Sequence, residues 1–232
     1  GKQQGENGDL RGKVRKRMIQ VVVQTILFGA ILFASAGTVR WMWVWVYLGI
    51  GLIILIANAL VLPRELIAER GEARENVKTW DKVITGAMII PTLGMLVVAG
   101  LDKRWAWSPD FPLVVLLAAL TAMVLGQALF TWAMASNVFF STRVRIQMER
   151  SHAVATAGPY RWVRHPGYVG YITFSMATPL ILGSLWGLVP AGVFSLLMIV
   201  RTAFEDRTLR EELEGYREYA QRVRYRLLPG VW

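Results

Sequence analysis

The stretch LVVLLAALTAMVLGQALFTWAMA, residues 113–135, contains no charged side chain. An uncharged apolar run of about 20 residues is long enough to cross the hydrocarbon core of a bilayer as a helix. The 232-residue chain, which is 54% hydrophobic, has further uncharged runs at 19–36, 41–62, 83–101 and 167–200. Because helices and closed barrels are the structures that span lipid, these helix-length runs predict an all-α integral membrane protein.

The last uncharged run predicts two helices. Residues 167–200 are interrupted at Pro179, Gly183 and Pro190. Each half has about 16 residues, or ~24 Å of helix, which is short for a ~30 Å hydrocarbon core. We therefore expect a C-terminal hairpin of two short or tilted helices, and about six transmembrane helices in all.

The polar segments carry further structural predictions. Residues 1–10 are polar and glycine-rich, which predicts disorder before a first helix over 18–38. The alternating charges of 63–82 indicate a short surface helix, and Pro91 with Gly94 predicts a kink in the third span. After the hairpin, one apolar stripe predicts a continuous cytoplasmic amphipathic helix over residues 203–224, with the stripe made by Leu209, Leu213, Tyr216, Ala220 and Val223.

The basic residues are distributed unevenly between the two ends of the predicted spans. Of the 26 Lys and Arg residues, 23 lie in one set of alternate polar segments and 3 in the other. The positive-inside rule therefore places both termini in the cytoplasm, and the net charge of +10 reflects topology and anionic lipid rather than nucleic acid. The 23 lie in 1–18, 63–82, 136–166 and 201–232, and the 3 in 37–40 and 102–112.

Composition also excludes several kinds of site. The chain has no cysteine, which excludes disulfides, thiolate metal sites and a cysteine nucleophile. No polar segment is long enough for a separate soluble catalytic domain, which needs roughly 50 residues or more. A ligand site must therefore be built from loops, helix ends and the C-terminal segment.

The segment GPYRWVRHPGYVG, residues 158–170, has the most unusual chemistry. Its Pro and Gly residues dictate a fixed, non-helical backbone where the chain re-enters the membrane. Such backbone at membrane depth must be buried in protein or line a cavity. The alternative is a juxtamembrane anchor, in which Tyr, Trp and Arg side chains lie among lipid head groups.

Two other groups of residues lie at the same predicted face. Glu205 and Asp206 are adjacent acids that follow Arg201 at helical spacing, and the alternative is a pair that stabilises a helix start. Asn137 precedes an aromatic pair at the exit of the 113–135 run, where the alternative is a helix cap. His152 is expected to be an exposed loop residue.

These residues occur in an order that resembles a known family. The pattern runs A-x-N-x-F-F over 135–140, T-A-G-P-Y-R-W-V-R-H-P-G-Y-V-G over 156–170, R-x-x-x-E-D-x-x-L over 201–209, and then Y-x-x-Y from Tyr216. It resembles the isoprenylcysteine carboxyl methyltransferase family and, more distantly, phospholipid N-methyltransferases. The similarity covers about residues 60–232. The chain departs from it at Asp206, where the family usually has a second Glu.

The resemblance implies a cofactor, S-adenosylmethionine, and a lipophilic methyl acceptor, with membrane lipids around the protein and neither a metal nor nucleic acid as partner. The expected catalytic residues are Arg201, Glu205 and Asn137. The expected cofactor-binding residues are Tyr160, Arg164, His165, Pro166, Tyr168, Gly170, Glu205, Asp206, Tyr216 and Tyr219. An acid of the pair would hold the ammonium of the cofactor, and the tyrosines would stack on adenine or face the sulfonium.

On this basis we divide the chain into a basic cytoplasmic N-terminus (1–17), a transmembrane helix pair (18–62) and a methyltransferase core (63–232) with its cofactor region at 136–232. The expected location is a prokaryotic cytoplasmic membrane. The acceptor is expected to be an isoprenylcysteine carboxylate, with a phospholipid amine, a quinone-like lipid or a small thiol left open. The alternatives for the whole chain are an NADPH-dependent reductase of the sterol-reductase type, which shares the R-H-P region, and a non-catalytic membrane protein.

Overall fold

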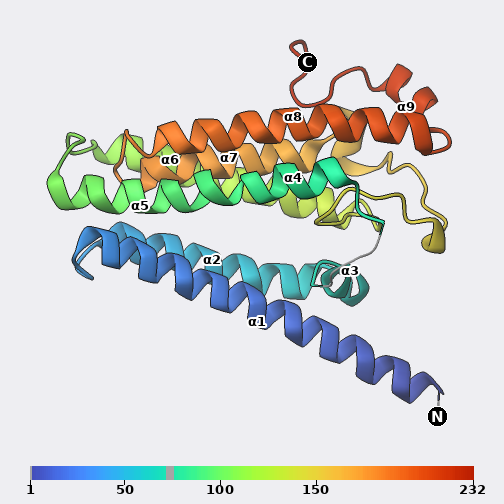
Figure 1. Cartoon of the computed structure of the whole chain (residues 1–232), viewed down its shortest axis with the longest axis horizontal. Coiled ribbons are helices and arrows are strands. Elements are labelled where there is room, and N and C mark those ends of the chain that lie inside the picture. Colours follow the sequence, from blue (N-terminus) through green and yellow to red (C-terminus); the bar gives the residue numbers. More distant parts are fainter. Residues whose placement is uncertain (1, 72–75) are drawn as a thin grey trace.

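The computed structural model describes residues 2–71 and 76–232, and for residues 2–7 the backbone alone. All regular structure in these ranges is helical, which confirms the all-α class (Figure 1). The helices in chain order are α1 (Lys2–Ala36), α2 (Met42–Val61), α3 (Arg64–Glu69), α4 (Thr79–Ala87), α5 (Ile89–Trp105), α6 (Leu113–Ala135), η1 (Met148–Arg150), η2 (Gly158–Arg161), α7 (Pro166–Ile181), α8 (Leu188–Glu212) and α9 (Tyr216–Arg222).

The described part of the chain contains five helical spans that are long and apolar enough to cross a membrane. They are Gly8–Ala36, Met42–Val61, Thr79–Trp105, Leu113–Ala135 and Leu188–Glu212. The sixth helix of the bundle, α7, has 16 residues, as expected for the short first half of the C-terminal hairpin. The chain is thus a multi-pass membrane protein.

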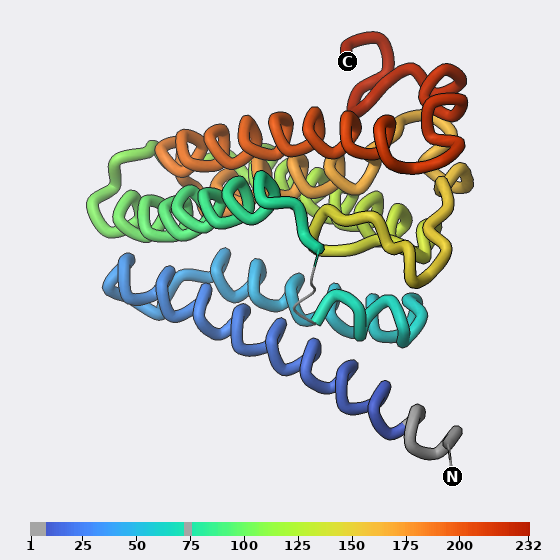
Figure 2. Tube along the Cα trace, turned by 45° about the vertical axis from the view of Figure 1, so that its right-hand side comes forward, coloured from blue at the N-terminus to red at the C-terminus, as the bar shows by residue number. Residues whose placement is uncertain are grey.

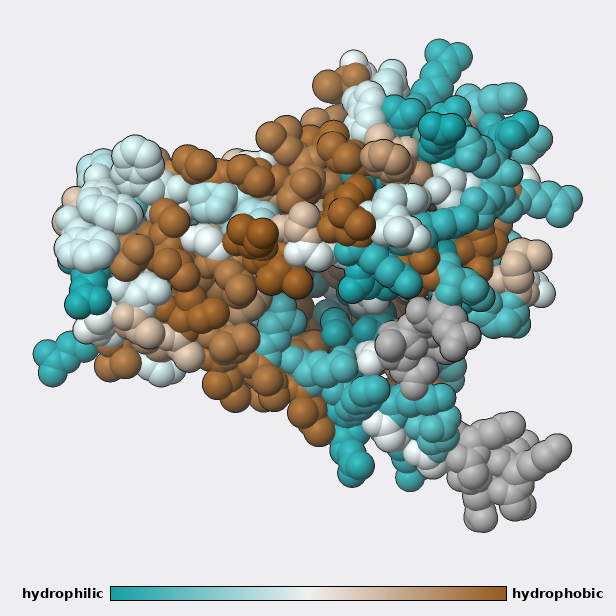
Figure 3. Space-filling model, viewed as in Figure 1, coloured by the Kyte–Doolittle hydropathy of each residue, from teal (hydrophilic) through white to brown (hydrophobic). Residues whose placement is uncertain are grey.

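The spans alternate in direction, so that both termini lie at one end of the bundle (Figures 1 and 2). We call this end, which also holds α3 and α9, the basic end. The connections 37–41, 106–112 and 182–187 lie at the opposite end, called here the far end. Hydrophilic side chains gather at the basic end, and hydrophobic ones cover the middle of the bundle (Figure 3).

Two predictions about the ends of helices were wrong. Helix α1 already begins at Lys2, within the segment predicted to be disordered. The predicted continuous helix over 203–224 is divided, because α8 continues through Glu212 and Gly215 then adopts a left-handed conformation with φ 78° before α9. The predicted stripe still packs on a single cluster, since α9 turns its apolar face back toward the end of α8.

The charged segment after α2 is more buried than predicted. It contains the expected short helix, α3, but three apolar side chains of α3 and that of Glu69 are buried, partly against α1. The third span is interrupted at Met88, between α4 and α5 and shortly before the predicted kink at Pro91 and Gly94. Pro91 explains it, because proline lacks an N–H and its ring clashes with the carbonyl of Ala87.

Helices α6 and α7 pack at very short range because glycines face each other. A Cβ atom added at Gly126 would lie 2.8 Å from the carbonyl oxygen of Gly170, and one added at Gly170 would clash with the Gly126 carbonyl oxygen. Small residues permit such close backbone contact in membrane bundles, where packing rather than hydrophobic burial holds helices together. Gly170, predicted to contact the cofactor, thus lies at this helix crossing.

A polar cluster fastens the far end. The buried carboxylate of Asp102 accepts hydrogen bonds from the hydroxyls of Ser108 at 2.6 Å and Ser184 at 2.5 Å. The Ser108 hydroxyl in turn accepts the backbone N–H of Leu185 at 2.8 Å. These contacts join the α5–α6 connection to the α7–α8 connection.

The first two helices form a separate layer below the others (Figures 1 and 2). Helix α1 packs on α5 near the far end, where Leu32 is buried. Helix α2 has one buried residue, Val44. The side-chain oxygen of Asn58, also on α2, accepts a hydrogen bond from the Thr131 hydroxyl of α6 at 2.9 Å. We call α1 and α2 the N-terminal pair, and α6 to α9 with their connections the core.

Candidate active site

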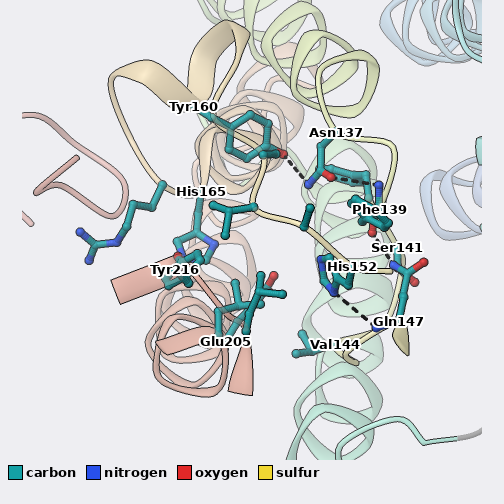
Figure 4. Close-up of a pocket in the computed structure, with 18 of the residues that line it drawn as sticks. Asn137, Phe139, Ser141, Val144, Gln147, His152, Tyr160, His165, Glu205 and Tyr216 are labelled. Carbon is teal, nitrogen blue, oxygen red and sulfur yellow. Dashed lines mark hydrogen bonds between the residues drawn. The ribbon is translucent and has the colours of Figure 1, made fainter. Parts of the chain in front are cut away.

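An open pocket lies at the basic end, between two walls (Figure 4). One wall consists of η2, the start of α7, the end of α8 and α9, which bring His165, Glu205 and Tyr216 to the cavity. The other wall is the connection from α6 to η2, which contributes Asn137 and His152. Segments that are distant in sequence therefore meet around one space.

Most of the predicted site residues line this pocket. They are Asn137, Tyr160, Arg164, His165, Tyr168, Glu205, Tyr216 and Tyr219. Four predicted residues do not belong to its lining: Pro166, Gly170, Arg201 and Asp206. Pro166 is the first residue of α7, a position that suits proline because an N–H there has no partner within the helix.

Asp206 is the centre of a buried ionic cluster. Its carboxylate is fully buried and accepts hydrogen bonds from Arg164 Nε at 2.6 Å and the Tyr216 hydroxyl at 3.0 Å. Arg210 and Arg226 each donate to its other oxygen at 3.0 Å. Because these partners occupy both oxygens, Asp206 holds the fold around the pocket and presents no free oxygen to a ligand.

The R-H-P turn is tied to the segment after α9. Arg164 Nη1 donates to the carbonyls of Val223 and Arg224, each at 2.7 Å. The backbone N–H groups of Arg164 and His165 donate to the carbonyls of Tyr225 and Arg226, each at 2.9 Å. These donors are engaged within the protein, so the turn is fixed by the C-terminal segment.

Glu205 differs from its neighbour Asp206 because it faces the cavity. The hydroxyl of Tyr168 donates to one of its carboxylate oxygens, and within residues 2–71 and 76–232 the other oxygen has no hydrogen-bond partner. The ring of Tyr168 is stacked with that of His165 at a centroid distance of 5.7 Å. One carboxylate oxygen of Glu205 is therefore held by Tyr168, and the other is available to a ligand.

Arg201 lies behind this pair, buried below the pocket surface. Its guanidinium carbon is 5.3 Å from the centroid of the Tyr168 ring. Arg201 Nε donates to the carboxylate of Asp81 at 2.7 Å, and Nη2 donates to the carbonyl of Thr142 at 3.0 Å. Asp81 was not among the predicted site residues, and its signal in the sequence is an acid beside Trp80 at the start of the third span.

The loop wall is organised by Asn137. Its side-chain oxygen accepts the backbone N–H of Phe139 at 3.0 Å, and its amide donates to the Tyr160 hydroxyl at 3.4 Å. Tyr219 fixes the same region from α9, since its hydroxyl donates to the Tyr160 carbonyl at 2.8 Å. Burial raises the pKa of both tyrosines well above the ordinary value, so both hydroxyls stay protonated near neutral pH.

His152 is half-buried rather than exposed, which corrects the sequence-based expectation. Its ring packs on Phe139 at a centroid distance of 4.6 Å, and its Nδ1 accepts the backbone N–H of Gln147 at 3.3 Å. Burial, together with the nearby guanidinium groups of Arg145 and Arg150, lowers the pKa of His152 to about 4. The side chain is therefore neutral at physiological pH.

Most charged side chains of the lining are paired within the protein. Glu205 is the one carboxylate among the described residues that line the pocket, and it lies on the wall made by α7 to α9. Arg164 on the same wall is bound to Asp206, and Arg145 on the loop wall is bound to Glu69 and Glu149. Arg143, also on the loop wall, has no ion pair in the part of the chain that the structure describes. Glu205 and Arg143 suit the two charges of a zwitterionic ligand, and the tyrosines of the lining offer aromatic faces for a ring or a cationic centre.

The region around the pocket is similar in sequence to proteins of a known family. Residues 117–213 match the model of the isoprenylcysteine carboxyl methyltransferase family. This region is therefore similar to the members of that family. The family match extends from within α6 to the end of α8 and so includes the R-H-P turn, Arg201 and Glu205. The predicted family resemblance is confirmed.

Several curated relatives have the same family name. Protein-S-isoprenylcysteine O-methyltransferase B of Arabidopsis thaliana is 30% identical over 132 residues, 53% of this chain and 60% of the relative. The human protein-S-isoprenylcysteine O-methyltransferase is 33% identical over 112 residues, which are 45% of this chain and 38% of the relative. The Schizosaccharomyces pombe protein is 32% identical over 114 residues, 46% of each. The matched part thus covers between 38% and 60% of these relatives' lengths.

Proposed function

We propose that this protein is an S-adenosylmethionine-dependent membrane methyltransferase that esterifies the carboxylate of a lipophilic, isoprenylcysteine-like acceptor. The observation that carries this proposal is the meeting of the R-H-P turn with Glu205 in one pocket at the basic end. The family match and the names of the relatives support the reaction class.

The lining of the pocket fits the proposed methyl donor. Glu205 has a carboxylate oxygen available for the ammonium of the cofactor, in a charge-assisted hydrogen bond. Tyr160 and Tyr216 offer ring faces to the adenine or the sulfonium, and Arg143 of the loop wall would bind the cofactor carboxylate. When bound, the cofactor supplies an electrophilic methyl group on sulfur.

The chain's own residues would act mainly by positioning. An acceptor carboxylate is already charged at neutral pH and needs no general base. Catalysis then depends on holding it in line with the bond to the methyl group, which can lower a barrier by up to ~7–11 kcal/mol. We assign Asn137 to orienting the acceptor at the loop wall, and Arg201 to holding Tyr168 and Glu205 in place through its contact with the Tyr168 ring.

The location of the pocket suits two substrates from different phases. The basic end carries most of the Lys and Arg residues, so we assign it, with both termini, to the cytoplasmic side. A polar donor would then enter from the cytosol, while a lipophilic acceptor would arrive from the bilayer. The prokaryotic origin of the membrane remains part of the proposal.

Binding of S-adenosylhomocysteine to the detergent-purified protein tests the donor site. Calorimetry is expected to show saturable binding, and Glu205→Gln is expected to weaken it by about tenfold or more because a charged hydrogen bond is lost. Glu211→Gln, an exposed change on the same helix, is the control. Unchanged affinity in Glu205→Gln would refute the assigned role of Glu205.

Two further experiments, a methyl-transfer assay and a titration with NADPH, test the reaction class. Transfer of labelled methyl groups from the donor to N-acetyl-S-farnesylcysteine is expected, with release of the label on ester hydrolysis. If the protein binds NADPH but does not bind S-adenosylhomocysteine, the result would indicate the reductase alternative. Binding of neither would indicate a protein that lacks the catalytic activity.

A further inference from the structure

Two arginines from outside the family-matched region lie side by side next to the pocket. Arg70 ends α3, and Arg17 belongs to the first helix. A Cβ added at Gly71, the residue after Arg70, would lie 3.0 Å from the Cβ of Arg17, and the Gln20 side chain donates to the Gly71 carbonyl at 3.3 Å. The cations thus come from two helices that this contact brings together.

Arg70 is a cation that has no acidic partner among the described residues. Its Nη1 atom is buried and forms no hydrogen bond, and in the described part of the chain neither Arg70 nor Arg17 has an ion pair. The Arg70 guanidinium carbon lies 5.4 Å from the Phe130 ring centroid and 5.3 Å from that of Phe140. These aromatic faces attract the cation but supply no hydrogen-bond acceptor in its plane.

The surroundings of Arg70 disfavour its charge. Burial and the neighbouring Arg17 lower the pKa of Arg70 to about 10, and Arg201 contributes in the same direction. Arg70 is still protonated at neutral pH. A desolvated cation beside a like charge, with an unused donor, is costly to maintain, and a bound anion would remove this cost.

The arginines adjoin the proposed reaction site. Phe140, on which Arg70 lies, also lines the pocket. Arg201 is close enough to Arg70 for the two charges to interact. Toward the basic end, the space-filling view shows an opening between the layer of α1 and the layer above it, with hydrophilic side chains around it (Figure 3). An anion held by Arg70 would therefore lie about one side chain away from the pocket.

We propose that Arg17 and Arg70 form a subsite that binds the carboxylate of the lipophilic acceptor before methyl transfer. This inference rests on the proposed function and names the feature by which the acceptor is recognised. Guanidinium groups bind carboxylates in a planar, often bidentate arrangement. Since methylation converts the carboxylate into a neutral ester, the subsite favours substrate over product and promotes release of the ester.

The proposal makes a distinctive kinetic prediction. An interaction that holds the charged ground state lowers KM but does not stabilise the transition state preferentially, because the carboxylate loses charge as the ester forms. Loss of Arg70 is therefore expected to raise the KM for the acceptor with little loss of kcat. A purely structural role for Arg70 would reduce both the folded fraction and kcat.

A binding experiment tests the subsite without turnover. The full-length protein in nanodiscs of phosphatidylcholine is titrated with N-acetyl-S-farnesylcysteine and with its methyl ester. The wild type is expected to bind the acid at least about tenfold more tightly than the ester. Arg70→Gln and Arg17→Gln are expected to remove this preference, Arg70→Lys to retain part of it, and Arg64→Gln, an exposed change on α3, to leave it intact.

Controls separate this proposal from its alternatives. Unchanged S-adenosylhomocysteine affinity in Arg70→Gln shows that the donor site is folded, so failure of the subsite and failure of the methyltransferase assignment are distinguishable. Equal binding of acid and ester by the wild type would overturn the proposal. If phosphatidylglycerol in the nanodisc competes with the acid in the wild type and not in Arg70→Gln, the subsite binds lipid phosphate, and the acceptor assignment is wrong.

Discussion

The core and the N-terminal pair are held together by different means. In the core, α6 and α7 touch backbone to backbone, and Asp206 connects α8 with the R-H-P turn and the C-terminal segment through ionic hydrogen bonds. In the N-terminal pair, α2 has a single buried residue and exposes apolar side chains along its length. A helix surrounded by lipid needs no protein contacts to satisfy its backbone, so α2 can remain sparsely packed.

The largest difference between the two regions is expected when their acids are neutralised. Asp206→Asn leaves Arg164 buried with an incomplete set of acceptors, and removing one partner of a buried ion pair typically costs about 3–5 kcal/mol. Asp9→Asn in α1 removes an exposed pair with Lys13, worth less than about 1 kcal/mol. Denaturant unfolding in mixed micelles compares them, and similar losses would contradict the contrast.

Glycine substitutions probe the same contrast through packing. Gly170→Ala forces α7 away from α6, because the new Cβ meets backbone rather than a movable side chain, and a cost of about 1–3 kcal/mol is expected. Gly49→Ala on α2 introduces a Cβ with no atom within 4 Å and is expected to be neutral or slightly stabilising. Thermal unfolding in detergent measures both, and a tolerated Gly170→Ala would show that the crossing is loose.

Acid sensitivity is expected to reside in the core, which contains both histidines of the chain. The folded state holds the pKa of His152 near 4, whereas unfolded histidine titrates near 6.5. Between about pH 6.5 and pH 4 the unfolded state therefore binds more protons, and stability falls as the pH falls. This contribution is fully present above about pH 6.5.

The variant His152→Phe keeps an aromatic ring against Phe139 and removes the titrating group. Between pH 7 and pH 4, its free energy of unfolding is expected to fall by about 1–2 kcal/mol less than that of the wild type. The change in Tm between these two pH values measures the difference. If the two proteins show the same pH dependence, His152 is not held neutral in the folded state.

The smallest effect is expected where the two regions meet inside the membrane. Asn58→Ala deletes the acceptor for Thr131 between α2 and α6, and interhelical hydrogen bonds of this kind contribute about 0.6 kcal/mol on average. A double-mutant cycle with Thr131→Val isolates this contribution. A coupling energy several times larger would show that α2 is an integral part of the core.

The sequence predicted those features that depend on composition and local pattern. The uncharged runs predicted the spans, and the R-H-P turn and Glu205 were expected at one site, where the pocket brings them together. The apolar stripe from Leu209 to Val223 predicted the right cluster. The hydrophobic pattern did not predict the break at Gly215, because glycine in a left-handed conformation reverses the chain without altering that pattern.

The contacts that could not be predicted join residues that are distant in the chain. Arg201 and Asp81 are 120 positions apart, and neither neighbourhood indicates the other. The segment that contains Arg70 resembles a solvated surface, since acids and bases alternate along it, and only folding shows that one of the bases is desolvated. Helix α8 continues past Arg201 because Leu, Glu and Arg favour the helix, although the composition changes there.

The Asp102 cluster has a mechanical consequence. It fixes the two far-end connections to each other, so the ends of α5 to α8 on that side cannot separate without breaking hydrogen bonds to a buried carboxylate. The far end therefore holds the spacing of these helices, and the pocket is built on a frame that is fixed at the end opposite to it.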